Sequence, residues 1–248
     1  MIDTHAHLDA LDDPDAAVER AREAGVSRIL TVGTDPARCR RALELAEDHE
    51  GVYAILGIHP HEAGRVEPGA IQEVRRLQSH PKAVAVGEIG LDHFRDYAPR
   101  DAQRRLLDAQ LALAADIGKP VVIHTRAADE DTRAALASFS GTVVLHCFSS
   151  TRLLAEALER GWYVSFAGNV TFPKATDLRL AATQVPADRI LAETDAPYLA
   201  PQPVRGRRNE PAYVRHTLAA LAAARGEEPA ELEARIERNA AACFGLPV

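Results

Sequence analysis

Short apolar runs rich in β-branched residues alternate with amphipathic stretches along the chain, which predicts repeated βα units around a parallel sheet. The eight strands we expect are Met1–His5, Arg28–Val32, Val52–Ile58, Ala83–Glu88, Val121–His124, Thr142–His146, Trp162–Ser165 and Ile190–Glu193. The helices expected between and after them are Ala16–Ala24, Pro36–Glu47, Ile71–Gln78, Arg100–Ile117, Asp131–Phe139, Leu153–Arg160, Ala212–Ala224 and Ala230–Ala242. Because no linker or repeat divides the chain, we expect a single domain over residues 1–248.

Residues of the kinds that bind metals stand where these apolar runs end. His5 and His7 are two positions apart, so in a strand both side chains point to the same face. His-x-His is a short motif that also arises by chance, but further histidines and carboxylates follow at the ends of later strands. The full set of candidate ligands is His5, His7, Glu88, His124, His146 and Asp195. Four imidazoles and two carboxylates are enough for two metal ions.

The positions of these residues favour a closed barrel over an open doubly wound sheet. His5 belongs to the first strand and Asp195 follows the last, and those strands are neighbours only if the sheet closes on itself. In such barrels the catalytic groups lie at the carboxyl ends of the strands, where all the candidate ligands are found. We therefore expect an α/β fold, a closed (β/α)8 TIM barrel with additional C-terminal helices.

Composition narrows the class of protein. A length of 248 residues is typical of such a barrel, and the net charge of −7 disfavours broad coating of nucleic acid while leaving room for a local contact. Cys39, Cys147 and Cys243 lack CxxC spacing, which fits reduced thiols. Apolar stretches fall short of the ~18 residues of a membrane span, and no leader precedes Asp3. A cytoplasmic protein without a membrane partner is expected.

Several candidate residues have a simpler alternative role. Glu88 at the end of a buried strand requires a partner or a metal, or else it caps the following helix. Strand alternation predicts that Cys147 faces away from the site as a small buried residue. Glu193 and Asp195 share a face by the same rule, and Asp195 is the expected general base that accepts a proton from metal-bound water.

Six motifs follow one another along the chain: Asp3-Thr-His-Ala-His-Leu-Asp, Gly57-Ile-His-Pro, Gly87-Glu-Ile-Gly-Leu-Asp, Val122-Ile-His-Thr-Arg, Leu145-His-Cys-Phe-Ser and Glu193-Thr-Asp-Ala-Pro-Tyr-Leu. In this combination and order the chain resembles the TatD family of metal-dependent deoxyribonucleases, within the amidohydrolase-like barrels. The resemblance implies that the six candidate ligands hold two divalent ions (Mg, Mn or Zn), with Glu88 bridging them. It also implies that DNA phosphodiesters are cleaved and that His59 lies on the substrate side.

The chain departs from the family at Ile89 and His93, where threonine and an aromatic residue are common. His93 is expected in a loop, with a phosphate contact as the alternative, and His61 is expected to be a solvated loop residue. Arg126 is expected either to orient a phosphate or to pair with an acid such as Asp129. The loop after the last strand carries three basic residues that are placed to neutralise a DNA backbone, namely Arg205, Arg207 and Arg208.

The leading hypothesis is a metal-dependent hydrolase that cleaves DNA, single-stranded or at strand ends, with a hydroxide activated by two metal ions and with Asp195 and Glu88 as catalytic groups. The alternative is an amidohydrolase-type barrel enzyme that hydrolyses a small amide, lactone or ester. Some of those enzymes bridge their metals with a carboxylated lysine, but Lys82 and Lys119 stand at strand starts, the wrong ends. A catalytically silent interaction module is disfavoured, because it has no need for buried charged ligands.

Overall fold

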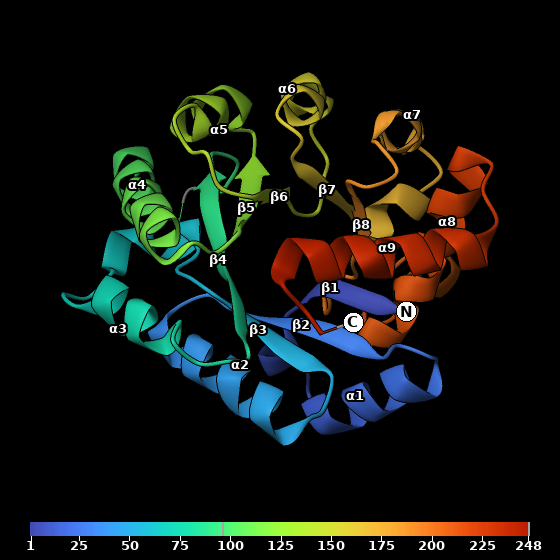
Figure 1. The fold of residues 1–248 in the computed structure, drawn as a ribbon, viewed down its shortest axis with the longest axis horizontal. Helices are drawn as coiled ribbons and strands as arrows, with labels where there is room; N and C mark the ends of the chain where they lie inside the picture. Colours follow the sequence, from blue (N-terminus) through green and yellow to red (C-terminus); the bar gives the residue numbers. More distant parts are fainter. Residues whose placement is uncertain (96, 248) are drawn as a thin grey trace.

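Eight parallel strands, each paired with the next one along the chain, form the centre of the computed structural model, which describes residues 1–95 and 97–247 (Figure 1). The strands are β1 Ile2–Ala6, β2 Arg28–Gly33, β3 Val52–Leu56, β4 Ala83–Asp92, β5 Val121–Arg126, β6 Val143–Leu145, β7 Tyr163–Phe166 and β8 Ile190–Ala192. Their order in the sheet is the order in the sequence, as in a barrel built from successive βα units.

The sheet closes between its first and last strands. A parallel bridge joins Ala6 to Ala196, just beyond β8, and the backbone N–H of His7 donates to Ala196 O at 2.7 Å. The backbone N–H of Asp195 donates to His5 O at 2.9 Å. The expectation of a closed TIM barrel is therefore confirmed. Closure places His5 and His7, the first candidate ligands in the chain, beside Asp195, the last.

Helices surround the barrel (Figure 1). They are α1 Pro14–Glu23, α2 Pro36–Asp48, α3 Ala70–Leu77, α4 Arg100–Ile117, α5 Asp129–Leu136, α6 Leu154–Glu159, α7 Thr176–Gln184, α8 Val214–Arg225 and α9 Pro229–Phe244. Local chemistry explains where the first two begin, since Asp13 and Asp35 each precede a proline and accept a hydrogen bond from a backbone N–H of the first turn. Within the described residues, no helix combines the length and the apolar character needed to cross a bilayer.

The sequence pattern did not predict α7. Its leucines, Leu178 and Leu180, stand two positions apart, and Leu180 is 59% exposed. Only Ala181 and Ala182 of this helix are buried, so the segment lacks the apolar stripe by which helices are recognised.

The end of β4 also differs from the prediction, because the strand continues to Asp92 and Glu88 lies inside it. The glycines of this segment permit close contact between strands. At Gly90, where φ is 146°, an added Cβ would lie 1.9 Å from His124 O of the neighbouring strand. The pairing of β4 with β5 shifts its register between Val86 and Ile89, on either side of Glu88.

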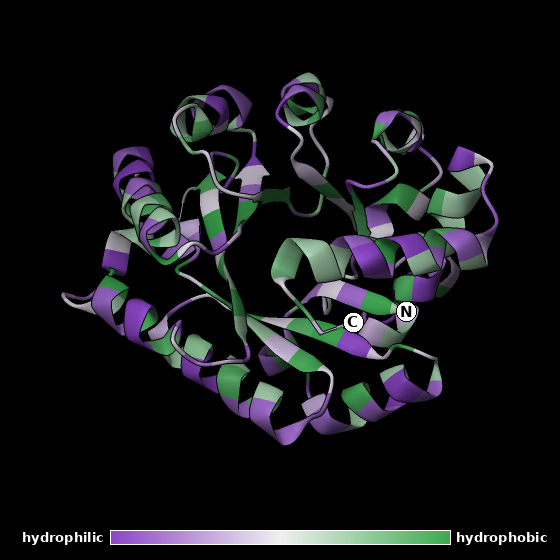
Figure 2. Cartoon of the chain, in the orientation of Figure 1, coloured by the Kyte–Doolittle hydropathy of each residue, from purple (hydrophilic) through white to green (hydrophobic). Residues whose placement is uncertain are grey.

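Buried apolar side chains from the strands and from the helices form one hydrophobic core. Along the helices, hydrophilic residues alternate with apolar ones (Figure 2). The last helix, α9, covers the amino-terminal end of the barrel. The N-terminal amino group lies 3.0 Å from Glu233 and 2.9 Å from Glu237, and Asn239 donates to Ile190 O at 2.9 Å. The carboxyl end of the barrel is left for the functional groups.

Candidate metal centre and its cavity

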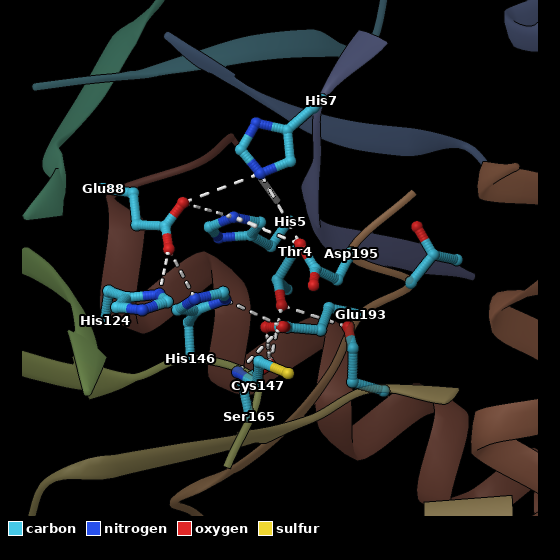
Figure 3. A network of polar contacts seen from close by, with 12 residues as sticks. Thr4, His5, His7, Glu88, His124, His146, Cys147, Ser165, Glu193 and Asp195 are labelled. Carbon is cyan, nitrogen blue, oxygen red and sulfur yellow. Dashed lines mark hydrogen bonds and ion pairs between the residues drawn. The ribbon is translucent and has the colours of Figure 1, made fainter. Parts of the chain in front are cut away.

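The six expected ligands converge at the carboxyl end of the barrel, around the carboxylate of Glu88 (Figure 3). Glu88 Oε2 lies 3.5 Å from His5 Nε2 and 3.6 Å from His7 Nε2. Asp195 Oδ1 lies 3.5 Å from His7 Nε2 and 4.0 Å from His5 Nε2, which completes the cluster on this side.

The other oxygen of Glu88 faces a second group of imidazoles. Glu88 Oε1 lies 2.7 Å from His124 Nδ1 and 2.8 Å from His146 Nε2. His59, expected on the substrate side, joins this group with its Nε2 at 3.4 Å. The two oxygens of one carboxylate thus point to two different ligand groups, the geometry required of a bridging ligand.

The side chains fit a divalent cation. The ligand atoms of His5, His7 and Glu88 lie within 4.8 Å of one another, and so do those of His5, His146 and Asp195. His5 is fully buried, and neither of its ring nitrogens has a hydrogen-bond partner among the described residues. A buried polar atom without a partner is costly, and a cation bound at the ring nitrogen removes that cost. Nitrogen and oxygen donors of this kind suit zinc and manganese, and magnesium where oxygen dominates.

The electrostatics keep the carboxylates ready to bind. Burial raises the pKa of Glu88, but the charges of His146 and His59 and hydrogen bonds from His124 and His146 outweigh it and hold the pKa well below the ordinary 4.5. Burial likewise opposes ionisation of Asp195, yet the hydrogen bond from His7 and the charges of His146, His7 and His5 lower its pKa. Both groups are therefore ionised at neutral pH, as metal ligands must be.

Glu193 supports the centre from outside the ligand set. Its Oε1 lies 3.0 Å from His146 Nδ1 and accepts the backbone N–H of Cys147 at 2.8 Å, and its Oε2 accepts the hydroxyl of Ser165 at 2.5 Å. A carboxylate on the far nitrogen of a metal-binding imidazole fixes the ring and its tautomer. β8 ends at Ala192, so strand alternation does not set the directions of Glu193 and the residues after it.

Asp92 is a site residue that sequence reasoning missed. It is fully buried, and its Oδ2 lies 2.8 Å from His61 Nε2 and 3.3 Å from His124 Nε2. Asp92 stands four positions after Glu88, so in a continuous strand both side chains lie on the same face. The predicted strand ends at Glu88, however, and so does not include Asp92. The expectation that His61 is a solvated loop residue is wrong, since its ring lies beside the ligands and is only 26% exposed.

Two buried glutamines of α4 fix the strand ends that carry these groups. Gln110 accepts the N–H of Ile58 at 2.7 Å and donates to Ile58 O at 2.9 Å. Seven positions earlier, Gln103 accepts the N–H of Asp92 at 2.8 Å and donates to Asp92 O at 3.0 Å. The amides satisfy buried backbone groups at the ends of β3 and β4, so the positions of His59 and Asp92 depend on α4.

Asp3 holds the segment between β8 and Asp195. Its carboxylate accepts the N–H of Thr194 at 2.9 Å and the hydroxyl of the same residue at 2.5 Å. Burial raises the pKa of Asp3 to about 8. Through its two bonds to Thr194, Asp3 orients the backbone that presents Asp195.

A cavity of about 670 Å³ opens above the centre. It is lined by five of the six expected ligands, with His5 buried beneath them, and by His59, His61 and Asp92. Cys147 also lines it, so the prediction that this residue faces away is wrong. β6 ends at Leu145 and Cys147 has φ 43°, so strand alternation does not apply there. Burial, with the charges of Asp195, Glu193 and Glu88, raises the pKa of the Cys147 thiol well above 9.0, which keeps it protonated.

The predicted substrate-binding arginines are placed differently from one another. Arg126 lines the cavity, and within the described part of the chain no carboxylate pairs with it, so the alternative of a pair with Asp129 is not observed. Its guanidinium lies 4.0 Å from the centre of the Phe94 ring. His93 lies beyond the end of β4, as expected of a loop residue, with Nδ1 3.5 Å from Asp131 Oδ2.

The other three, Arg205, Arg207 and Arg208, stand on the loop after β8. Among the described residues, none of the three lines the cavity. Arg208 pairs with Asp12 at 2.6 Å, and the Arg205 guanidinium lies 4.3 Å from the centre of the Phe172 ring. Arg205 also donates to Ala200 O at 3.3 Å, next to Leu199 of the cavity. Arg207 is exposed.

Comparison with known proteins finds whole-length relatives. Residues 2–245 match the family model described as TatD related DNase. The chain is 38% identical over 229 residues to the uncharacterized metal-dependent hydrolase YabD of Bacillus subtilis (strain 168), which covers 90% of both chains. It is also 38% identical over 245 residues to the 3'-5' ssDNA/RNA exonuclease TatD of Klebsiella pneumoniae (strain 342), covering 95% of this chain and 93% of that protein.

Solved structures agree in fold. The crystal structure of YjjV, a TatD homolog from Escherichia coli K12, superimposes with a TM-score of 0.94 at 31% identity, covering 100% of this chain and 98% of that one. An uncharacterized amidohydrolase from Saccharomyces cerevisiae has a TM-score of 0.87 at 18% identity, covering 98% and 99%. At that identity the second likeness concerns the barrel fold alone.

Proposed function

The chain belongs to the family of TatD related DNases and is a metal-dependent hydrolase acting on ester bonds, and we propose that its substrate is single-stranded nucleic acid, cleaved from the 3' end. The observation that carries this proposal is the convergence of four imidazoles and two carboxylates beneath an open cavity. Relatives named as 3'-5' ssDNA/RNA exonucleases support the same substrate class, with RNA added to the DNA expected from the sequence.

We propose that the ligand set holds two divalent ions. His5 and His7 face one oxygen of Glu88, with Asp195 beside both rings, and His124 and His146 face the other oxygen. When bound, divalent ions polarise a phosphoryl oxygen and lower the pKa of the attacking water. Magnesium, manganese and zinc all remain candidates for the physiological ion.

The chain's own groups then position the substrate and move a proton. Asp195 is ionised, lies beside His7 and lines the cavity, so its carboxylate can accept a proton from an attacking water there. Glu88 keeps the two ligand groups at a fixed separation through its own two oxygens. Arg126, on the cavity wall, is placed to contact a phosphate of the bound strand. The cytoplasmic location expected from the sequence stays a prediction.

One activity panel tests the proposal. The protein is loaded in turn with magnesium, manganese and zinc and given a single-stranded DNA or RNA labelled at its 5' end, beside a lactone and an amide substrate. Stepwise shortening of the nucleic acid from its 3' end is the expected result. Hydrolysis of the lactone or amide with no cleavage of nucleic acid would instead establish the small-substrate alternative.

A further inference from the structure

Two aromatic side chains stand exposed on the segment between β4 and α4, beside the cavity. Phe94 is 61% exposed and Tyr97 is 60% exposed. Tyr97 lines the cavity, and its ring lies edge-on to the ring of His61 with 4.8 Å between the centres. Large exposed aromatic groups at the edge of a cavity mark a surface that binds something.

Positive charge accompanies these rings. The guanidinium of Arg126 lies 4.0 Å from the centre of the Phe94 ring, and the guanidinium of Arg95 lies 5.7 Å from it. Both arginines line the cavity. Aromatic faces next to arginines form the surface on which proteins stack an unpaired base while holding its phosphate, and stacking tolerates every base.

Hydrogen bonds fix the backbone of Phe94 and Arg95 relative to the ligands. One oxygen of Asp92, Oδ1, accepts the N–H of Phe94 at 2.9 Å and the N–H of Arg95 at 2.8 Å. The other, Oδ2, faces His61 and His124. One carboxylate thus connects the backbone of Phe94 and Arg95 to the ligand cluster, so that little ordering of this backbone is needed when a substrate binds.

The far end of the segment is fixed as well. Gln103 of α4, which binds the backbone of Asp92, also donates to Ala98 O at 2.9 Å. One buried amide therefore binds the backbone on both sides of the two exposed rings, at Asp92 and at Ala98.

We propose that Phe94, Tyr97 and Arg126 form a nucleobase subsite, which stacks an unpaired base of the strand whose phosphodiester lies at the ligand cluster. The subsite rests on the proposed function and deepens it, because it assigns the preference for single strands to particular side chains. A base in a duplex is stacked and paired already, and freeing it costs energy. The subsite has no need to read base edges, so it predicts little sequence preference.

The test is binding of a single-stranded oligonucleotide to the metal-loaded protein. The oligonucleotide carries phosphorothioate linkages, which slow its cleavage, and the fluorescent base 2-aminopurine, which is quenched when it stacks. The wild type should quench this base on binding. Phe94→Ala should abolish the quenching and weaken binding about tenfold or more. Phe94→Trp should restore both.

A second oligonucleotide and a control variant separate stacking from other causes. An oligonucleotide with abasic nucleotides should bind wild type and Phe94→Ala equally. Leu180→Ala removes an apolar side chain of similar exposure, 59%, on α7 outside the cavity, and should change neither the quenching nor the binding. The subsite is refuted if Phe94→Ala leaves the quenching intact, or if it weakens the binding of both oligonucleotides by the same factor.

Cleavage of an unmodified strand is measured in parallel. Quenching by a wild type that cleaves no nucleic acid overturns the proposed function and leaves the subsite standing. Cleavage by a protein whose quenching survives Phe94→Ala overturns the subsite alone.

Discussion

Glu193 accepts a hydrogen bond from His146 Nδ1 at 3.0 Å, on the opposite side of the ring from Glu88, which lies 2.8 Å from Nε2. The imidazole is therefore held between two carboxylates. Because a carboxylate accepts hydrogen bonds, Glu193 keeps the proton on Nδ1 and leaves Nε2 free to bind a metal. The arrangement makes the charge of a residue outside the ligand set important for metal affinity.

Glu193→Gln should weaken metal binding by about 10–100-fold, the usual effect of losing such a partner. A glutamine of the same shape can still accept the bonds from His146 and Cys147, so the fold should survive. Calorimetric titration of the metal-free protein with zinc or manganese measures the change. Glu159→Gln at the exposed end of α6 is the control. If Glu193→Gln binds the metal as tightly as the wild type, the charge of Glu193 does not contribute to metal affinity.

Asp195→Asn should lower turnover of a single-stranded oligonucleotide by roughly 100-fold or more, the size expected for losing a general base. The substitution keeps the shape of the side chain and removes its charge, so thermal unfolding should change little. Steady-state kinetics with saturating metal measures the loss. Asp108→Asn, half-exposed on α4, serves as the control. Turnover close to wild type in Asp195→Asn would mean that another group accepts the proton.

Metal affinity should rise with pH. Burial lowers the pKa of His146, but the charges of Glu88 and Glu193 outweigh it and raise the pKa well above 6.5, so a proton competes with the metal for this ring. In the metal-free protein this raised pKa stabilises the fold below pH ~6.5, and the gain is lost as pH rises through the folded-state value. The increase in Tm on adding metal should therefore grow from about pH 6 to pH 9.

Differential scanning calorimetry with and without metal across that range measures the increase. Calorimetric titration in buffers of different ionisation enthalpy should also detect proton release on binding. A Tm increase that is the same at every pH, with no proton released, would contradict the coupling.

Replacing Arg205, Arg207 and Arg208 together by alanine should weaken oligonucleotide binding and reduce its salt dependence by about one unit of slope for each phosphate that these arginines neutralise. Metal content should stay the same, because these side chains lie away from the ligands. Binding is measured at several salt concentrations, with Arg75→Ala on α3 as the control. An unchanged salt slope would show that these arginines are solvated loop residues that do not contact the phosphates.

The sequence predicts those parts of the molecule that depend on local periodicity and on residue type. The apolar runs locate all eight strands, and the need to bring His5 and Asp195 together predicts the closed barrel. The ligand set emerges because histidines and carboxylates at strand ends are unusual unless they bind something.

The parts that the sequence does not predict depend on interactions between distant segments. The predicted strand ends at Glu88, whereas Gly90 allows β4 to continue close against β5 and so brings Asp92 into the site. Cys147 and Asp195 have φ 43° and φ 56°, conformations that strand alternation does not describe. The hydrogen bond between Asp92 and His61 joins residues 31 positions apart, and no pattern within a single segment reveals it.

Closure of the barrel also sets when the centre can form. Thr194, which Asp3 holds in place, stands 191 residues after Asp3 in the chain. At roughly 5–20 residues per second, a ribosome needs about 10 to 40 seconds between making the two. For nearly all of that interval His5 and His7 exist without Asp195, their partner in the finished cluster. The centre is therefore completed late in synthesis, and a nascent chain that stops short of Thr194 carries its first histidines without the site that they serve.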